Sequence, residues 1–294
     1  MLMLDSIESV QQQLLTEKYV ANRALATVIF LSLGMEKPLF LEGEAGVGKT
    51  EVAKVLSRIL DTRLIRLQCY EGLDVHTAVY EWAYSRQLLH LKLLEASGAS
   101  RDEMESDLYG EKFLLARPLL QAIQDNGDQT PVLLIDEIDR ADEEFESFLL
   151  EILSDFQITI PEVGTLVATR PPVVIVTSNR TRQIHDALKR RCVYHWLDYP
   201  DFETEHRIVT LKYPDISERL SRQIVTAVQT LRGEELFKPP GVAETLDWAQ
   251  ALCLMDCQQL DEQVIKDTLG VLLKYQDDVQ RVRDRVALIS PETP

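Results

Sequence analysis

Residues 43–50 read GEAGVGKT and match the phosphate-binding pattern GxxxxGK[ST]. They follow the apolar run 38–41 and precede a helix-like stretch at 51–56. A strand, a glycine-rich turn and a helix in this order point backbone N–H groups at an anion near a helix N-terminus. Lys49 is expected to reach the β- and γ-phosphates, and the Thr50 hydroxyl is expected to bind Mg²⁺. The segment predicts binding of a nucleoside triphosphate through Gly43, Glu44, Ala45, Gly46, Val47, Gly48, Lys49, Thr50 and Glu51.

Two carboxylates follow the apolar run 132–135. In an open α/β sheet the carboxyl end of a buried strand faces the ligand crevice. Asp136 is placed to hold Mg²⁺ through water beside Thr50. Glu137 can act as a general base that polarises the attacking water. Acidic turns end many strands, but the phosphate loop in the same chain favours the catalytic interpretation.

Ser178 and Asn179 follow a third predicted strand at 173–177. The Asn179 amide both donates and accepts hydrogen bonds, so it can hold a water molecule near a γ-phosphate. The alternative is that Asn179 only caps the turn after the strand. We favour the first interpretation because of the two motifs above.

Arg190 and Arg191 precede the last apolar run, 193–197. Arginine neutralises charge on a transferring phosphoryl group and forms two parallel hydrogen bonds with it. A basic pair at the end of a helix also complements the helix dipole. Position in the sequence does not separate these two roles.

The elements that would position these residues alternate between strand and helix as far as residue 200. Helical spacing covers much of 1–36, and short apolar strands follow at 64–68, 132–135, 173–177 and 193–197. This alternation predicts an α/β fold with a mostly parallel sheet and helices on its faces. Beyond 200 only amphipathic helices are evident, at 204–212, 216–231, 242–254 and 260–279. We therefore expect an α/β core at 1–200 and a small helical domain at 201–294.

The composition narrows the classes of partner. The chain has 294 residues, and 31 Lys and Arg against 48 Asp and Glu give a net charge of −17. There is no basic stripe for a phosphate backbone, so nucleic acid is not expected as a partner; the acidity can equally reflect solubility. No apolar run is long enough to span a bilayer and no signal peptide opens the chain. Four cysteines without a CxxC pair fit a reducing cytoplasm, and Cys253 and Cys257 lack a second pair of ligands.

In this order the motifs resemble the AAA+ ATPases, and more closely the MoxR family. The resemblance covers nearly the whole chain. It rests on the loop 43–50, the strand end 132–137, the Thr-Ser-Asn end at 177–179 and the arginine pair 190–191. The segments 171–182, 189–192 and 238–248 resemble the subgroup associated with aerobic carbon-monoxide dehydrogenase.

The resemblance implies a three-layer core with sheet order 5-1-4-3-2, which places Asn179 between the phosphate loop and Glu137. It implies that Arg190, Arg191 or both act on the neighbouring subunit in a homo-oligomeric ring, with a hexamer expected. It implies a β-hairpin at about 157–170 and an insert at about 73–94. That insert, with Trp82, Tyr84 and Arg86, is a candidate contact for substrates or partners; packing on the core is the equal alternative.

One departure concerns the helical lid. MoxR relatives commonly carry an arginine at the start of a lid helix, where it contacts the γ-phosphate. Here Pro239 and Pro240 occupy that place, and Lys238 is the nearest cation. Lys238 can substitute as a point charge, or the lid does not sense the nucleotide directly. The resemblance also assigns adenine contacts to Tyr19 and Val20.

The function implied by the resemblance is ATP-driven remodelling of a protein client. MoxR-type ATPases commonly act with a von Willebrand factor A protein in maturation or metal-cofactor insertion. The implied client is a molybdenum- or copper-containing hydroxylase such as carbon-monoxide dehydrogenase. Two alternatives are a nucleic-acid motor or loader, which the net charge disfavours, and a non-hydrolysing nucleotide-gated scaffold. Glu137 and Asn179 argue against the scaffold, whereas the missing lid arginine leaves room for it.

Overall fold

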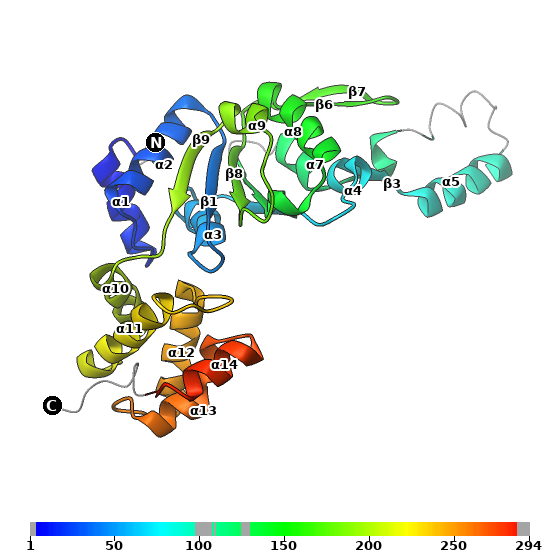
Figure 1. The fold of residues 1–294 in the computed structure, drawn as a ribbon. Coiled ribbons are helices and arrows are strands. Elements are labelled where there is room, and N and C mark those ends of the chain that lie inside the picture. Colours follow the sequence, from blue (N-terminus) through cyan, green and yellow to red (C-terminus); the bar gives the residue numbers. More distant parts are fainter. Residues whose placement is uncertain (1–3, 98–107, 109, 125–129, 287–294) are drawn as a thin grey trace. The chain divides into compact units, whose positions relative to one another are not determined.

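The computed structural model of the chain describes residues 4–97, 108, 110–124 and 130–286 (Figure 1). The described chain divides into two compact units. The first contains residues 27–42 and the described residues of 53–195, and the second contains residues 4–26, 43–52 and 196–286. The phosphate loop therefore belongs to the second unit, while the strand before it lies in the first.

A five-stranded sheet is the centre of the first unit. Its strands are β1 (Leu39–Gly43), β2 (Leu64–Gln68), β5 (Val132–Asp136), β8 (Val173–Ser178) and β9 (Val193–Leu197). The order is β2-β5-β8-β1-β9, and the pairs β2–β5, β5–β8 and β1–β8 are parallel. Numbered among themselves, these strands have the order 5-1-4-3-2, which confirms the predicted topology. Every residue of β1 and β5 is buried, as expected for central parallel strands covered on both faces.

Helices flank this sheet, and they account for the rest of its core. They include α2 (Arg23–Met35), α3 (Lys49–Ile59), α7 (Pro118–Ile123), α8 (Glu143–Asp155) and α9 (Asp186–Arg191). The apolar cluster contains Phe40 of β1, Ile135 of β5 and Phe145 of α8. This packing holds the strands in place, and with them the polar residues at their carboxyl ends.

The predicted hairpin before β8 is present as β6 (Gln157–Ile160) and β7 (Gly164–Val167), which pair antiparallel. Gly164 has φ +103°, a backbone conformation that glycine adopts without steric cost. A second small sheet pairs β3 (Tyr80–Trp82) with β4 (Leu114–Ala116). Two short helical segments adjoin it, α4 (Val75–Val79) and the 3₁₀ turn Glu111–Phe113.

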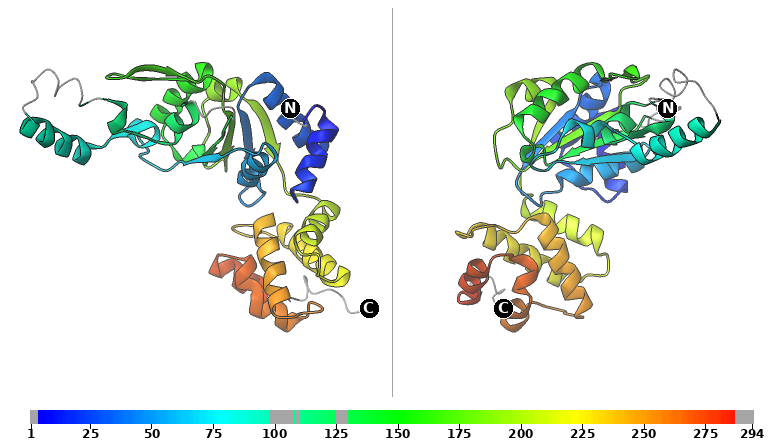
Figure 2. Two further views of the ribbon diagram at one scale, coloured as in Figure 1. Left: turned by 180° about the vertical axis from the view of Figure 1, so that it is seen from behind. Right: turned by 90° about the vertical axis from the view of Figure 1, so that its right-hand side faces the viewer.

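The insert expected at 73–94 contains α4, β3 and the start of α5 (Tyr84–Ser97). Both views in Figure 2 show α5 extending away from the five-stranded sheet. Trp82 is only 7% exposed and packs in the core of the first unit, whereas Tyr84 is 70% exposed and Arg86 is exposed. Trp82 therefore follows the packing alternative, because its ring is covered by core side chains.

The second unit is helical apart from the phosphate loop. Its described helices include α1 (Ile7–Thr16), α10 (Phe202–Lys212), α11 (Glu218–Arg232), α12 (Val242–Leu254), α13 (Glu262–Leu272) and α14 (Gln276–Arg283). A single helix expected at 260–279 is wrong, because the chain leaves the helical conformation at Leu273 and Tyr275. Leu273 is buried in the apolar core of this unit, and the Tyr275 ring packs against Phe237 at a tilt of 56°, with ring centroids 4.5 Å apart.

A buried ion pair joins three of these helices. Arg232 of α11 donates to both Glu205 oxygens of α10 at 2.7 Å, and the Thr245 hydroxyl of α12 donates to the same carboxylate at 2.7 Å. Arg232 also donates to the Pro240 carbonyl at 2.8 Å. Because a buried charge is tolerated only when paired, this network fixes how α12 begins.

No helix among the described residues is both long and apolar enough to cross a lipid bilayer.

Candidate functional site

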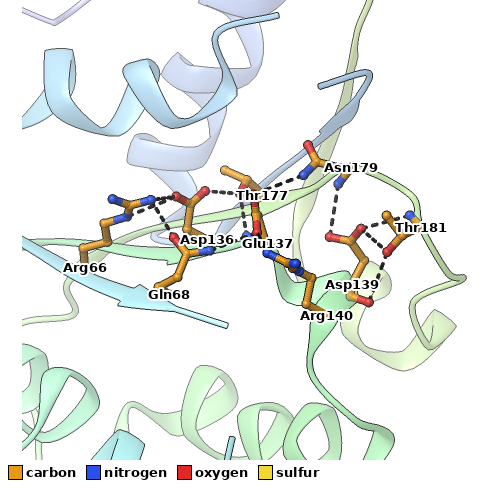
Figure 3. A network of polar contacts seen from close by, with 9 residues as sticks. All are labelled: Arg66, Gln68, Asp136, Glu137, Asp139, Arg140, Thr177, Asn179 and Thr181. Carbon is orange, nitrogen blue, oxygen red and sulfur yellow. Dashed lines mark hydrogen bonds and ion pairs between the residues drawn. The ribbon is translucent and has the colours of Figure 1, made fainter. Parts of the chain in front are cut away.

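The ends of β5 and β8 bring the predicted catalytic residues of the first unit together (Figure 3). Ile135 of β5 pairs with Val176 of β8, so Asp136 and Thr177 follow side by side. The Thr177 hydroxyl donates to Asp136 Oδ1 at 2.6 Å. Adjacent parallel strands thus place a carboxylate and a hydroxyl side by side at one edge of the sheet.

Asp136 is also held from the other side by β2. Arg66 donates to Asp136 Oδ2 through Nε at 3.1 Å and through Nη2 at 2.6 Å. Asp136 is 2% exposed, whereas the Arg66 side chain is 51% exposed. The charge of this buried carboxylate is therefore balanced by a cation that reaches in from the surface.

Glu137 follows Asp136 in the left-handed conformation, with φ 56° and ψ 51°. Its backbone N–H donates to the Thr177 hydroxyl at 3.0 Å. A non-glycine residue in this region carries a cost of about 1 kcal/mol, which surrounding interactions must offset. The strained backbone turns the carboxylate away from the direction that the strand would give it.

Three side chains hold the Glu137 carboxylate. Gln68 Nε2 and Arg140 Nη1 donate to Oε2 at 3.1 and 2.9 Å. Asn179 Nδ2 donates to Oε1 at 3.4 Å. The predicted general base and the predicted water-positioning amide are therefore in contact, as Figure 3 shows. A carboxylate held at both oxygens has a fixed orientation, which general-base catalysis requires.

Asp139 anchors the loop that carries Asn179. Its Oδ1 accepts from the Asn179 backbone N–H at 3.1 Å, and its Oδ2 accepts from the Thr181 N–H and hydroxyl at 2.9 and 2.7 Å. Burial raises the pKa of Asp139, but the hydrogen bonds from Thr181 and Asn179 outweigh it, so the pKa lies below its ordinary value. Asp139 is therefore charged and holds Asn179 in place.

The sequence interpretation gave no role to six residues of this cluster: Arg66, Gln68, Asp139, Arg140, Thr177 and Thr181. Asp139 and Arg140 lie within three residues of Glu137, so the run DEIDR carried a signal. Arg66 and Gln68 gave none on their own, because only the β2–β5 register, with Gln68 beside Asp136, brings them to the carboxylates.

The second unit contains the phosphate loop. Gly46 and Gly48 have φ values of +80° and +96°, and α3 begins at Lys49. Lys49 is 5% exposed, and its ammonium donates to the Gly43 and Glu44 carbonyls at 2.7 and 2.6 Å. The loop thus has the glycine turn and the helix start that the motif predicted, with the lysine folded back on it.

The start of α12 packs on this loop within the second unit. The Ala243 N–H donates to the Gly46 carbonyl at 3.1 Å. A Cβ atom added to Gly241 would lie 2.8 Å from Gly46 Cα and 2.9 Å from the Ala45 carbonyl oxygen. Only glycine at this position permits so close an approach of the two backbones.

Two predicted nucleotide contacts occupy different surroundings in this unit. The Tyr19 ring lies beside the loop, 3.8 Å from the point where a Cβ on Gly48 would stand. Burial raises the pKa of Tyr19 above its ordinary range. Lys238 is exposed, and its backbone N–H donates to Asp278 at 3.2 Å. The roles of Tyr19, Val20 and Lys238 toward a nucleotide stay predictions.

The two arginines of α9 differ in their surroundings. Arg191 donates to the Ser154 hydroxyl of α8 at 2.7 Å and to the Ala187 carbonyl at 3.2 Å. Arg190 is exposed, and no hydrogen bond or ion pair to another described residue involves its side chain. Arg191 thus has a structural role within its own chain, whereas the Arg190 guanidinium is available to a partner.

Each unit by itself carries groups that suit Mg²⁺ or a triphosphate. Asp136 in the first unit offers a carboxylate and Thr50 in the second offers a hydroxyl, and both are hard oxygen ligands of the kind that Mg²⁺ prefers. Gly46 and Gly48 have positive φ values, as in loops whose backbone N–H groups face an anion. Lys49 supplies a positive charge for the phosphates. The residues present therefore fit both groups.

Comparison with known proteins matches residues 38–192, more than half of the chain, to the family described as AAA domain (dynein-related subfamily). An uncharacterized protein of Staphylococcus aureus strain bovine RF122 / ET3-1 is 25% identical over 247 residues, 80% of this chain and 85% of that protein. An uncharacterized protein of strain USA300 is 24% identical over the same shares of each chain.

Two solved structures of Thermotoga maritima RuvB resemble the fold weakly. A point mutant of RuvB is 17% identical, with a TM-score of 0.49 and coverage of 94% of this chain and 74% of that chain. The RuvB Holliday junction branch migration motor is 16% identical, with a TM-score of 0.47 and coverage of 92% and 73%.

Proposed function

The chain belongs to the AAA domain family, dynein-related subfamily, and on that premise we propose that it is an ATP-hydrolysing remodelling chaperone of the MoxR type. The proposal is supported most directly by the contact between Glu137 and Asn179 at the ends of β5 and β8. A general base needs a carboxylate with a fixed orientation and a neighbouring group that positions the water. Glu137 and Asn179 offer these two groups.

Residues of all three motifs have roles in the proposed reaction. Lys49 and the backbone of 43–50 bind the phosphates, while Thr50 and Asp136 hold Mg²⁺. When bound, Mg²⁺ neutralises charge that develops on the phosphate oxygens. Glu137 accepts a proton from the attacking water, and Asn179 orients that water.

We further propose that hydrolysis occurs in a ring of identical subunits, in which Arg190 completes the site of its neighbour. Arginine supplied by another subunit stabilises the charge of a phosphoryl transition state. Both side chains are exposed, and Arg190 suits this role better because Arg191 is bound to Ser154. An expected hexamer follows from the resemblance to the MoxR family.

The proposed client is a metal-containing hydroxylase, such as a carbon-monoxide dehydrogenase, matured together with a von Willebrand factor A partner. This part rests on the resemblance of 171–182, 189–192 and 238–248 to one MoxR subgroup. A net charge of −17 fits a protein partner better than a nucleic acid.

The test of hydrolysis is the variant Glu137→Gln, which keeps the shape of the side chain and removes its basicity. We expect phosphate release to fall by roughly 10²–10⁴-fold, the usual contribution of a general base, with ATP affinity within about twofold of the wild type. Phosphate release and calorimetric titration with ATP and Mg²⁺ measure the two quantities. The control is Glu144→Gln, an exposed carboxylate at the start of α8, which should change neither.

Normal phosphate release by Glu137→Gln would remove Glu137 from the role of base. The client is tested separately by incubating the purified chain and its von Willebrand factor A partner with a metal-free hydroxylase. An ATP-dependent gain of bound metal, measured by mass spectrometry and lost with Glu137→Gln, is the expected result. Equal metal content with and without ATP would contradict the maturation role while leaving the ATPase intact.

A further inference from the structure

A half-buried ion pair in the first unit joins β1 to α9. Lys189 Nζ lies 3.1 and 3.0 Å from the two oxygens of Glu42. Glu42 is 4% exposed, and it directly precedes the phosphate loop in the chain. Lys189 directly precedes Arg190. The pair thus connects the strand that leads into the loop with the helix that carries the exposed arginine.

Aromatic rings enclose this pair. The Tyr194 hydroxyl of β9 donates to Glu42 Oε2 at 2.8 Å. The Lys189 ammonium lies 5.5 Å from the ring centroids of both Phe40 and Tyr194. Burial and the neighbouring Glu42 carboxylate raise the pKa of Tyr194 to about 12, so its hydroxyl stays a donor.

The surroundings give α9 little freedom to turn. Lys189 is held by Glu42 and two rings, Leu188 is buried in the core, and Arg191 is bound to Ser154 of α8. Arg190 lies between these fixed residues in the sequence, and its side chain is exposed. A helix held on each side of one residue presents that residue in one direction.

We propose that Glu42 and Lys189 are positioning residues that orient Arg190 toward the active site of the neighbouring subunit. The inference rests on the proposed function, in which Arg190 acts in trans. In addition, Glu42 of β1 holds α9 through Lys189 and so orients Arg190. β1 is the strand that leads into the phosphate loop of the same subunit. Loss of the pair should therefore impair the neighbour's site and spare the subunit that carries the change.

Mixed assemblies of two inactive variants test this prediction. One variant, Arg190→Ala, keeps a complete nucleotide site and lacks the arginine; the other, Glu137→Gln, keeps the arginine and lacks the base. Each alone should be inactive, and an equimolar mixture should recover phosphate release. If the mixture stays inactive, the in-trans function itself fails, and that outcome is separate from failure of the positioning role.

Lys189→Met is then added to one subunit type at a time, because methionine preserves the length of the side chain and its packing on the rings. Added to the Glu137→Gln subunit, which donates the arginine, it should lower the recovered rate at least tenfold. Added to the Arg190→Ala subunit, it should leave the rate within twofold, which also shows that the variant folds and binds ATP. Glu42→Gln should reproduce this asymmetry.

Three outcomes would overturn the positioning role. Lys189→Met could lower the recovered rate only when placed in the Arg190→Ala subunit, lower it equally in both placements, or lower it in neither. In the first two cases the pair would serve the subunit's own site or its general stability. The matched control is Lys266→Met in the Glu137→Gln subunit, which breaks an exposed pair with Glu262 on α13. That change should leave the recovered rate unaltered.

Discussion

Asp139 binds the loop after β8 through three donors, the N–H groups of Asn179 and Thr181 and the Thr181 hydroxyl. Without the carboxylate the two N–H groups would lose this acceptor, and the Thr181 hydroxyl would keep only the Asp139 carbonyl at 3.4 Å. These bonds are partly buried, and an unsatisfied buried donor costs about 1–3 kcal/mol. Asp139 therefore contributes to stability and to the position of Asn179 at the same time.

We predict that Asp139→Ala lowers the free energy of unfolding by about 2–4 kcal/mol. Phosphate release should also fall, because Asn179 loses its anchor. Urea denaturation measures the first effect. Asp155→Ala, an exposed acid at the end of α8, is the control and should stay within about 0.5 kcal/mol of the wild type. An Asp139→Ala variant as stable as the control would show that the loop does not depend on this carboxylate.

The pH dependence of this contribution follows from its sign. The folded protein lowers the pKa of Asp139 below the ordinary value of 3.8, so folding favours the charged form. The contribution is complete above that value and is lost as the pH falls through the lower pKa of the folded state. The stability difference between the wild type and Asp139→Asn should shrink on acidification below pH 3.8. A difference that grows in acid would contradict the assignment.

The residues of the site differ in how far the sequence could predict them. Asp136, Glu137 and Asn179 stand at strand ends in a recognisable order, so topology alone brings them together. Arg66 and Gln68 lie in β2, seventy residues or so away in the sequence, and ordinary polar positions of a strand look the same. Their role depends on strand register, which no local pattern specifies.

At the scale of elements, the contact between α12 and the phosphate loop depends on two glycines. A Cβ on Gly241 would meet Gly46 Cα at 2.8 Å, and backbone atoms cannot move aside as a flexible side chain does. We predict that Gly241→Ala lowers the free energy of unfolding by about 1–3 kcal/mol, the usual cost of overpacking. Chemical denaturation of the full chain measures the change.

Gly270 of α13 provides the matched control. A Cβ added there would meet no atom within 4 Å, and alanine favours a helix interior by roughly 0.5–1 kcal/mol over glycine. Gly270→Ala should therefore stabilise the protein while Gly241→Ala destabilises it. Destabilisation by both, to a similar degree, would mean that the approach of the two backbones does not explain the effect.

The elements themselves were predictable where local pattern decides them. The strands 64–68 and 193–197 and the helix 242–254 have the expected bounds. The prediction of one helix at 260–279 was wrong because neither glycine nor proline marks the break at Leu273 in the sequence. Burial of Leu273 and packing of the Tyr275 ring against Phe237 accompany that break, and both are tertiary effects.

At the scale of the whole molecule, the net charge of −17 bears on the class of partner. Binding to a duplex depends on neutralising phosphates with Lys and Arg, and it weakens steeply with salt. We predict that double-stranded DNA does not raise phosphate release at physiological ionic strength. Phosphate release is measured while a DNA duplex is titrated into the protein. A parallel assay measures binding of the same duplex, with a basic DNA-binding protein as its positive control. Stimulation by DNA would favour a nucleic-acid motor.

The arginines of α9 give the clearest prediction about assembly. An arginine supplied in trans accelerates phosphoryl transfer by about 10³–10⁵-fold, so Arg190→Ala should lose hydrolysis to that extent and keep ATP binding. Arg191→Ala should lose only the bond to Ser154 and retain most of the wild-type rate. Wild-type phosphate release per subunit should rise with protein concentration, because an isolated subunit lacks the arginine of its neighbour. Equal losses in the two variants, or a rate per subunit independent of concentration, would contradict the assignment of Arg190 to the neighbouring site.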